Sequence, residues 1–477
     1  MKKILVFLTG MVLFMQHGQA QFKRHYWLNP ASVNYTLSYP TSNGEWMQAA
    51  ARQDRNSHFK NTIAVFRMDN SYATLDSRII GLPWSGGEEQ FDPYVDFEIH
   101  CIVESFNPTG YYIICGSIRR GEAAAGVSGL VVVIDAGLNP LSIREYPEVK
   151  NFYSVYAQDN FYYVCGQTKQ GQGIVLRDDV TNYVPTAQAY VTQQQWDYQK
   201  IRVRNSPGRG EIGVSGSFVS EDEPGEMGYT SFNATATNFS PIPNASWKFP
   251  PVNNHSIESK VVIANYPGAG GLGLILSVSD VNGIYTYLFV NYQTPTLPLT
   301  LPIAFKIPCY GSVLEDIDCA GDDGITSSYQ IAWIGNYPQQ TAYFANMNFP
   351  PQPMPFPFPT TAVRFIDFNP VPTTDNAYYS LRKVHYYKLP GDGKFHAGGY
   401  YYHNDGNKTT FAVTPELVLK EECTTEREEE TVSLVRPRLT FHSLIEMEVS
   451  VNELKKFSKK YHFCTMDCQG ENDCGNR

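Results

Sequence analysis

The segment Tyr111-Tyr-Ile-Ile-Cys-Gly116 recurs along the chain as Phe161-Tyr-Tyr-Val-Cys-Gly166 and, less closely, as Ile212-Gly-Val-Ser-Gly216. The closing glycines are 50 residues apart, a period typical of repeated supersecondary units. β-Branched and aromatic residues dominate the first two copies, and a polar turn precedes all three, which predicts a β-strand at each place. The repeat therefore predicts one structural unit for about every 50 residues of this region.

The same order of segments surrounds each copy. An apolar or alternating segment comes before the turn, as at residues 99–104 and 152–157, and two more follow the glycine, as at 130–135 and 141–146. Each unit is thus predicted to be a four-stranded antiparallel meander. Similar segments from about residue 31 and through the C-terminal half bring the number of units to seven, with six as the alternative.

A single meander cannot bury both of its faces, so neighbouring units must pack face to face. Units of this length favour an all-β propeller of about seven four-stranded antiparallel blades over residues 21–441. An array of immunoglobulin-like domains would need about 100 residues per domain and a Cys…Trp…Cys core, which this sequence lacks. The repeat glycines are expected to end their strands near a crowded centre.

With these units in view, residues 96–218 resemble the secreted β-propeller repeat proteins of Gram-negative bacteria, whose second blade strand has the form turn–Gly–Tyr–Ile–Ile–x–Gly. The resemblance fades towards the C-terminus. It implies a propeller fold and does not imply an activity, because propellers carry hydrolases, lyases, lectins and scaffolds alike.

The first 20 residues have the pattern of a signal peptide. Lys2 and Lys3 precede an apolar stretch from Ile4 to Met15, and Gly18-Gln-Ala20 offers small residues for cleavage. We therefore expect export to the periplasm, the cell surface or the medium. No later stretch approaches the roughly 20 apolar residues of a membrane-spanning helix, so no transmembrane segment is expected. The net charge of −10 argues against binding to nucleic acid.

The C-terminal tail, residues 442–477, is expected to hold a short helix and disulfides. Ser450-Val-Asn-Glu453 has the spacing of a capping box, which predicts a helix through Lys460. Nine cysteines in an exported chain favour disulfides over a zinc site. The candidates that would staple the tail are Cys423, Cys464, Cys468 and Cys474.

A second candidate pair is Cys101 and Cys115. They lie on consecutive predicted strands, and counting outward from the turn at residues 107–110 places them opposite each other. At such a position the Cα atoms are about 4.5 Å apart, within the range of a disulfide. A disulfide and two buried free thiols both remain open. Cys115 and Cys165 share one repeat position, which indicates that they fill the core.

No catalytic, cofactor-binding or metal-binding residue is assigned, because the sequence has no nucleophile elbow, HExxH, P-loop or dinucleotide fingerprint. Two groups of polar residues are interpreted as structural. One is a carboxylate group, interpreted as a strand and solvated turn rather than a calcium site: Glu315, Asp316, Asp318, Asp322 and Asp323. The other is a histidine group in an aromatic-rich sheet: His385, His396 and His403, with Asp405 nearby.

Aromatic residues make up 14% of the chain and favour binding surfaces as well as packing between blades. We expect a secreted or surface-exposed, non-enzymatic binding or scaffold propeller that recognises a protein or a glycan. The alternative is a polysaccharide-acting hydrolase or lyase with its site in the propeller funnel. That alternative requires acid and base residues that converge in the funnel.

Overall fold

The computed structural model describes residues 41–249 with short gaps and residues 443–461 throughout, and elsewhere it describes strands alone. Side chains are described within residues 41–242 and 443–461. Every regular element in these parts is a β-strand, and the strands pair antiparallel, so the predicted all-β class is confirmed. The predicted signal peptide, residues 1–20, lies outside the described residues.

The described strands form seven sheets, each built on a meander. The sheet that contains the Tyr111–Gly116 segment has, in order, β6 (Val95–Glu104), β7 (Tyr112–Arg120), β8 (Val127–Ile134) and β9 (Pro140–Tyr146). The next has β10 (Val149–Gln158), β11 (Phe161–Thr168), β12 (Gln172–Asp179) and β13 (Gln188–Gln195). The third copy gives β14 (Asp197–Ser206), β15 (Arg209–Phe218), β16 (Glu226–Ala234) and β17 (Phe239–Phe249).

Four further sheets continue the pattern on either side. One precedes the repeat, with β2 (Tyr35–Pro40), β3 (Trp46–Arg52), β4 (Thr62–Met68) and β5 (Thr74–Gly81). Two follow it, with β18 (Glu258–Asn265), β19 (Leu272–Asp280), β20 (Gly283–Asn291) and β21 (Ile303–Cys309), then β22 (Leu314–Gly321), β23 (Ser328–Gly335), β24 (Thr341–Asn348) and β25 (Val363–Asp367). The last has β26 (Tyr378–Leu389), β27 (Asp392–Tyr402) and β28 (Lys408–Val413), and it takes its fourth strand, β1 (Phe22–Trp27), from the start of the chain.

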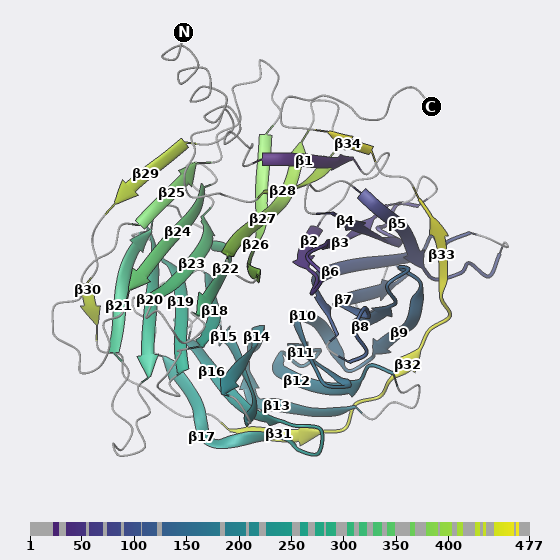
Figure 1. Ribbon diagram of the computed structural model, residues 1–477. Helices are drawn as coiled ribbons and strands as arrows, with labels where there is room; N and C mark the ends of the chain where they lie inside the picture. The colour runs from purple at the N-terminus through teal and green to yellow at the C-terminus, as the bar shows by residue number, and fades with distance from the viewer. Residues whose placement is uncertain are drawn as a thin grey trace, which may run out of the picture.

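The first strands of these meanders contact one another in a circular order. β2 contacts β6, and the contacts continue through β10, β14, β18 and β22 to β26, which in turn contacts β2. Figure 1 shows these strands around a common centre, with the last strand of each meander on the outside.

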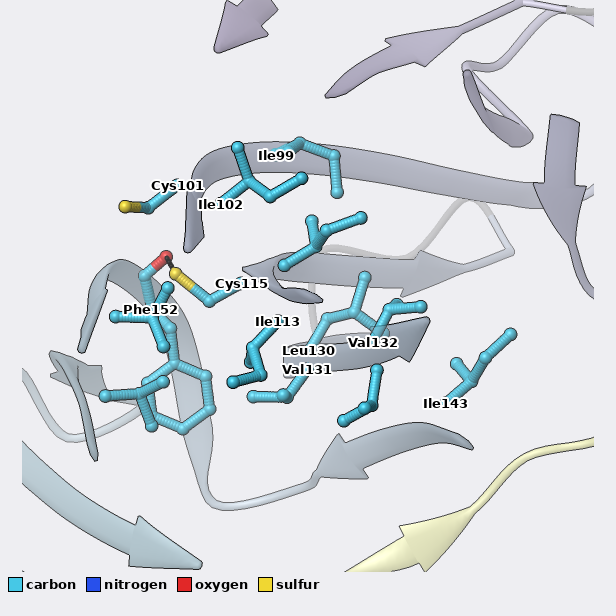
Figure 2. Close-up of a cluster of buried hydrophobic side chains, with 14 of the residues drawn as sticks. Ile99, Cys101, Ile102, Ile113, Cys115, Leu130, Val131, Val132, Ile143 and Phe152 are labelled. Carbon is cyan, nitrogen blue, oxygen red and sulfur yellow. Dashed lines mark hydrogen bonds between the residues drawn. The ribbon is translucent and has the colours of Figure 1, made fainter. Parts of the chain in front are cut away.

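Packing between sheets explains the continuous apolar runs of the repeat. Residues 112–118 of β7 and 128–134 of β8 are all buried, because both faces of their sheet are covered by neighbours. Figure 2 shows the resulting core, in which Ile113 and Val131 lie beside Phe152 of the next sheet. Burying a valine or isoleucine side chain completely contributes about 1.5–3 kcal/mol.

Each repeat glycine faces a β-bulge. The register of β6 on β7 shifts between Ile99, which pairs with Gly116, and Cys101, so that His100 is an extra residue. A Cβ atom on Gly116 would lie 1.8 Å from the carbonyl oxygen of Glu98. Glycine is therefore required where the bulged strand drives its carbonyl group against the second strand.

The same bulge recurs in the next two sheets. Tyr153 of β10 is the extra residue beside Gly166, and Gln199 of β14 is the extra residue beside Gly216. A Cβ atom on either glycine would lie 1.9 or 2.0 Å from a backbone oxygen of the first strand. Our expectation that these glycines end their strands is wrong, because all three lie within strands and the crowding comes from the bulges.

The C-terminal segment runs around the outside of the sheets, and we call it the belt (Figure 1). It adds a fifth strand to six of the seven described sheets and none to the β14–β17 sheet. Along the chain, the belt strands pair in turn with the outer strands of these sheets, in the reverse of the order in which the sheets occur in the sequence: β25, β21, β13, β9, β5 and β1. They are β29 (Thr425–Glu429), β30 (Ser433–Val435), β31 (Leu444–Met447), β32 (Asn452–Glu453), β33 (Phe457–Lys460) and β34 (Cys464–Met466).

The predicted helix from Ser450 through Lys460 is wrong, because β32 and β33 occupy this range. An isolated helix of this length is only marginally stable in water. The outer strands β9 and β5 instead offer backbone N–H and C=O groups along an open edge, and the belt pairs with them.

The tail disulfides stay a prediction. Cys423, Cys468 and Cys474 lie outside the described residues. Cys464 begins β34, and its side chain is not among those described.

Cys101 and Cys115 face each other in the register, as the turn predicted. Both are free thiols, and both are buried, as is Cys165. The Cys101–Cys115 disulfide is therefore not formed. Figure 2 shows the reason for one of them: the Cys115 thiol points to Phe152 of the neighbouring sheet and donates to its carbonyl oxygen at 3.7 Å.

Within the described residues, no helix is long and apolar enough to cross a membrane.

Candidate functional site

The three bulges place a polar side chain, and a second one two residues earlier, on the innermost strands of neighbouring sheets. The resulting group, which we call the bulge cluster, comprises Glu98 and His100 on β6, Asn151 and Tyr153 on β10, and Asp197 and Gln199 on β14. A bulge adds one residue and re-aims the side chains around it, and bulges are frequent beside functional sites. The repeat thus presents three polar pairs from equivalent positions.

His100 lies at the centre of the first half of the bulge cluster. Its Nε2 atom is 2.8 Å from the Asn151 amide nitrogen and 3.5 Å from Glu98 Oε1. Its ring meets the Tyr153 ring edge-on, with centroids 5.1 Å apart. The His100 side chain is 12% exposed and the Glu98 side chain 51% exposed, so the pair reaches from a packed interior to solvent.

Tyr153 stays protonated over the physiological range. Burial raises the pKa of its phenol, and the carboxylates of Asp197 and Glu98 raise it further. The hydroxyl group is therefore a neutral hydrogen-bond donor and acceptor beside an imidazole ring.

The carboxylate of Asp197 lies where burial disfavours its negative charge. Burial raises its pKa to about 6, and a hydrogen bond from the Gln199 amide and the positive charge of Lys150 oppose that rise. The Gln199 amide nitrogen donates to Asp197 Oδ2 at 3.5 Å. Near neutral pH the carboxylate is thus ionised at a position that disfavours its charge.

Three oxygen atoms of the bulge cluster have no partner within the described residues. They are Asn151 Oδ1, Asp197 Oδ1 and Gln199 Oε1, all hidden from solvent. A buried acceptor without a donor costs about 1–3 kcal/mol, and such groups in native structures call for an explanation. A ligand that brings hydroxyl or amine donors would satisfy these oxygens.

A second polar cluster has the opposite character. Arg144 donates to Asp178 Oδ2 at 3.0 Å and to the Tyr162 hydroxyl at 3.1 Å, and the Tyr146 and Tyr162 hydroxyl groups are 2.6 Å apart. All four side chains are at most 2% exposed. Because its groups are paired with one another and closed to solvent, this cluster is structural.

Bulges also occur in two sheets whose side chains are not described. The extra residues are Glu315 on β22 and Arg382 on β26. In the predicted carboxylate group, Glu315 is thus the bulge residue of β22, the position that His100 holds on β6. Asp316 and Asp318 follow it on β22. Asp322 and Asp323 lie outside the described residues.

Of the predicted histidine group, His385 and His396 are register partners on β26 and β27. His403 and Asp405 lie outside the described residues. Within the described residues no group of histidine, cysteine and carboxylate side chains is arranged to hold a metal ion.

Sequence reasoning missed the bulge cluster. The pattern that could have found it is a polar–x–polar triplet in the first strand of each repeat: Glu98-Ile-His100, Asn151-Phe-Tyr153 and Asp197-Tyr-Gln199. The triplets lie at unequal sequence distances from the repeat glycines, because the turns that join the first and second strands of the repeats differ in length. A comparison by fixed spacing therefore does not align them.

No known protein-family model matches the chain, and no curated protein has a sequence that matches it. The bulge cluster is therefore interpreted from its own geometry.

Asp197→Asn is expected to stabilise the protein at high pH. The pKa of Asp197 rises from 3.8 in the unfolded chain to about 6 in the folded protein, so stability is lost as pH rises through this interval. At pH 8 the variant should gain about 2 kcal/mol in the free energy of unfolding, a value reduced for partial solvation from about 1.4 kcal/mol per pKa unit.

Urea denaturation at pH 8 and pH 4 measures this difference, which should fall to about 0.4 kcal/mol at pH 4, close to the pKa of the unfolded chain. The exposed Asp159 is the control, since Asp159→Asn should change the free energy by less than about 0.5 kcal/mol at either pH. A loss of stability in Asp197→Asn at pH 8 would contradict the unfavourable environment assigned to this carboxylate.

Proposed function

We propose that the protein is an exported, seven-bladed β-propeller that binds a glycan through the bulge cluster and has no enzymatic activity. The propeller is supported by the circular contacts of the seven first strands and by β1, which completes the last sheet from the start of the chain. Export rests on the signal-peptide pattern of residues 1–20, and the relationship to secreted bacterial propellers rests on the repeat.

One observation carries the glycan proposal: unpartnered acceptor oxygens of Asp197 and Gln199 lie beside further hydrogen-bonding groups on neighbouring innermost strands. Sugars present many hydroxyl donors at short intervals. Carboxylate and amide oxygens bind these donors, and aromatic rings such as that of Tyr153 stack on the apolar faces of sugar rings. Burial raises the pKa of Asp197, so keeping its carboxylate ionised lowers the stability of the fold. Such a cost is expected of a residue that serves binding.

The test is a screen of the purified protein against immobilised oligosaccharides, followed by calorimetry on the ones that bind. Gln199→Ala and Asp197→Asn should each weaken binding about tenfold or more, since each removes or alters an acceptor that the ligand would satisfy. Gln194→Ala, at an exposed glutamine on β13, is the matched control and should bind as the unaltered protein does. Absence of glycan binding, or equal binding by all variants, would refute the proposal.

A second function is favoured by one contact. His100 Nε2 lies 3.5 Å from a Glu98 carboxylate oxygen, the kind of pair that serves as a general acid or base in a polysaccharide hydrolase or lyase. The two functions differ in product. Chain cleavage of a bound polysaccharide that disappears in His100→Ala while binding persists would replace the binding proposal with the enzymatic one.

A further inference from the structure

The Asn151 amide of the bulge cluster is oriented by its neighbours. Its nitrogen lies 2.8 Å from His100 Nε2. An amide nitrogen can only donate, so Nε2 accepts, and the His100 ring is neutral with its proton on Nδ1. Burial raises the pKa of the Tyr153 phenol, and a hydrogen bond from Asn151 opposes that rise. Because the amide nitrogen is engaged, Asn151 is left with Oδ1 as an acceptor, and this atom has no partner within the described residues.

A neutral His100 leaves the Glu98 carboxylate beside it without a cation. Glu98 Oε1 is 3.5 Å from His100 Nε2, which already accepts the amide of Asn151. The other carboxylate oxygen, Oε2, accepts a hydrogen bond from the Ser117 hydroxyl at 3.4 Å. No lysine or arginine among the described residues forms an ion pair with Glu98. An exposed carboxylate therefore lies next to the unpartnered carbonyl oxygen of Asn151.

The neighbouring innermost strands decide which charges surround this place. On one side β6 contacts β2, and the sequence around β2, residues 28–44, contains no acidic, basic or histidine residue. On the other side β14 brings Asp197, whose carboxylate adds to the effects of burial and of Glu98 in raising the pKa of Tyr153. The exposed Lys150 of β10 acts on Asp197. The Tyr153 phenol is thus influenced by two carboxylates, and a cation beside it would be stabilised by both and by the aromatic ring.

We propose that the glycan bound by the bulge cluster contains an amino sugar, whose ammonium group lies between Glu98 and Asn151 Oδ1. This proposal rests on the glycan binding proposed above and names the class of glycan. Glu98 and Asn151 both approach the same nitrogen of His100, so they lie close enough for one ammonium group to meet both. An ammonium group carries three donors, and its hydrogen bonds to a carboxylate are the strong, charge-assisted kind. The Tyr153 ring would contact the apolar face of the sugar.

Calorimetry near neutral pH with three β-1,4-linked disaccharides tests the proposal: the glucosamine disaccharide, its N,N′-diacetylated form and cellobiose. The three share one ring skeleton, and only the first carries ammonium groups. It should bind about tenfold or more tightly than the other two, because only an ammonium group pairs with the Glu98 carboxylate. This advantage should shrink as salt is added, since salt screens the charge of an exposed carboxylate.

Two variants make the outcome specific. Glu98→Gln removes the charge and keeps the shape of the side chain, so it should lower the affinity for the glucosamine disaccharide to about that for cellobiose. Glu448→Gln makes the same change at an exposed position of the belt and should keep the full advantage. Equal affinity for the three disaccharides, or an undiminished advantage in Glu98→Gln, would overturn the amino-sugar proposal and leave glycan binding standing. If no oligosaccharide of any kind binds, both proposals are wrong.

Discussion

Gly166→Ala is expected to lower the free energy of unfolding by about 4 kcal/mol or more, in the range of the most damaging single substitutions. The new Cβ atom would lie 1.9 Å from the carbonyl oxygen of Asn151 and 2.9 Å from both its carbonyl carbon and Phe152 Cα. All three are backbone atoms, so no side-chain rotation relieves the collision. Either β10 and β11 separate or the bulge is lost and the register slips.

A slip by one residue would turn the side chains of β10 to the opposite face. Val155 and Ala157, each 1% exposed, would then leave the core, and Asn151 and Tyr153 would leave the bulge cluster. We therefore expect the loss of stability and the loss of the proposed glycan binding to occur together in this variant.

Urea denaturation followed by circular dichroism measures the change, with Gly137→Ala as the control. At Gly137 the nearest atoms to a new Cβ are side-chain atoms of Asn139 and Asp135, at 3.0 and 3.3 Å, which can move. That substitution should change the free energy by less than about 0.5 kcal/mol. If Gly166→Ala were as mild as the control, the bulge would not be the reason for the repeat glycine.

The second large effect is expected from Arg144→Met, which should lower the free energy of unfolding by about 3–5 kcal/mol. The substitution leaves the Asp178 carboxylate, 0% exposed, without the cation that lies 3.0 Å away. Tyr146 and Tyr162 would still donate to it, at 2.9 and 3.1 Å. Burial raises the pKa of both tyrosines, so both hydroxyl groups stay protonated.

Arg144 also joins the belt to the β6–β9 sheet, since its Nε atom is 3.8 Å from Glu453 Oε2. The control is Arg120→Met, which removes a pair with Glu145 at 2.7 Å. The Arg120 side chain is 46% exposed, and such surface pairs contribute at most about 1 kcal/mol.

Denaturation of Arg144→Met, Asp178→Leu and the double variant separates the effect of a lone buried charge from the effect of lost packing. The double variant should be more stable than Arg144→Met alone, because it leaves no unpaired carboxylate. Additive losses would show that the charge of Asp178 is not what makes the single substitution costly.

The sequence alone predicted the strands of the repeat and their order. The period of 50 residues, the apolar runs and the polar turns are local signals, and strands β6 to β13 follow them closely. The opposition of Cys101 and Cys115 followed from the turn between their strands, because a hairpin sets the register of its own two strands.

The sequence analysis missed the bulge cluster and pointed only to the glycines opposite the bulges. Gly116, Gly166 and Gly216 indicated close approach, but the residue that crowds each one lies on another strand and is recognised only when the two strands are aligned. The unpartnered oxygens of Asp197 and Gln199 depend in turn on what the neighbouring sheets bring near them.

Tertiary structure alone decided the belt. Ser450 to Lys460 carries a helix-start pattern, yet the segment becomes β32 and β33 on strands more than 300 residues earlier in the chain. The pairing of β1 with β28, which lies almost 400 residues later in the chain, was equally absent from the local sequence pattern. Local propensity is worth tenths of a kcal/mol per residue, whereas an open sheet edge offers a row of backbone hydrogen bonds that exists only after the sheets have formed.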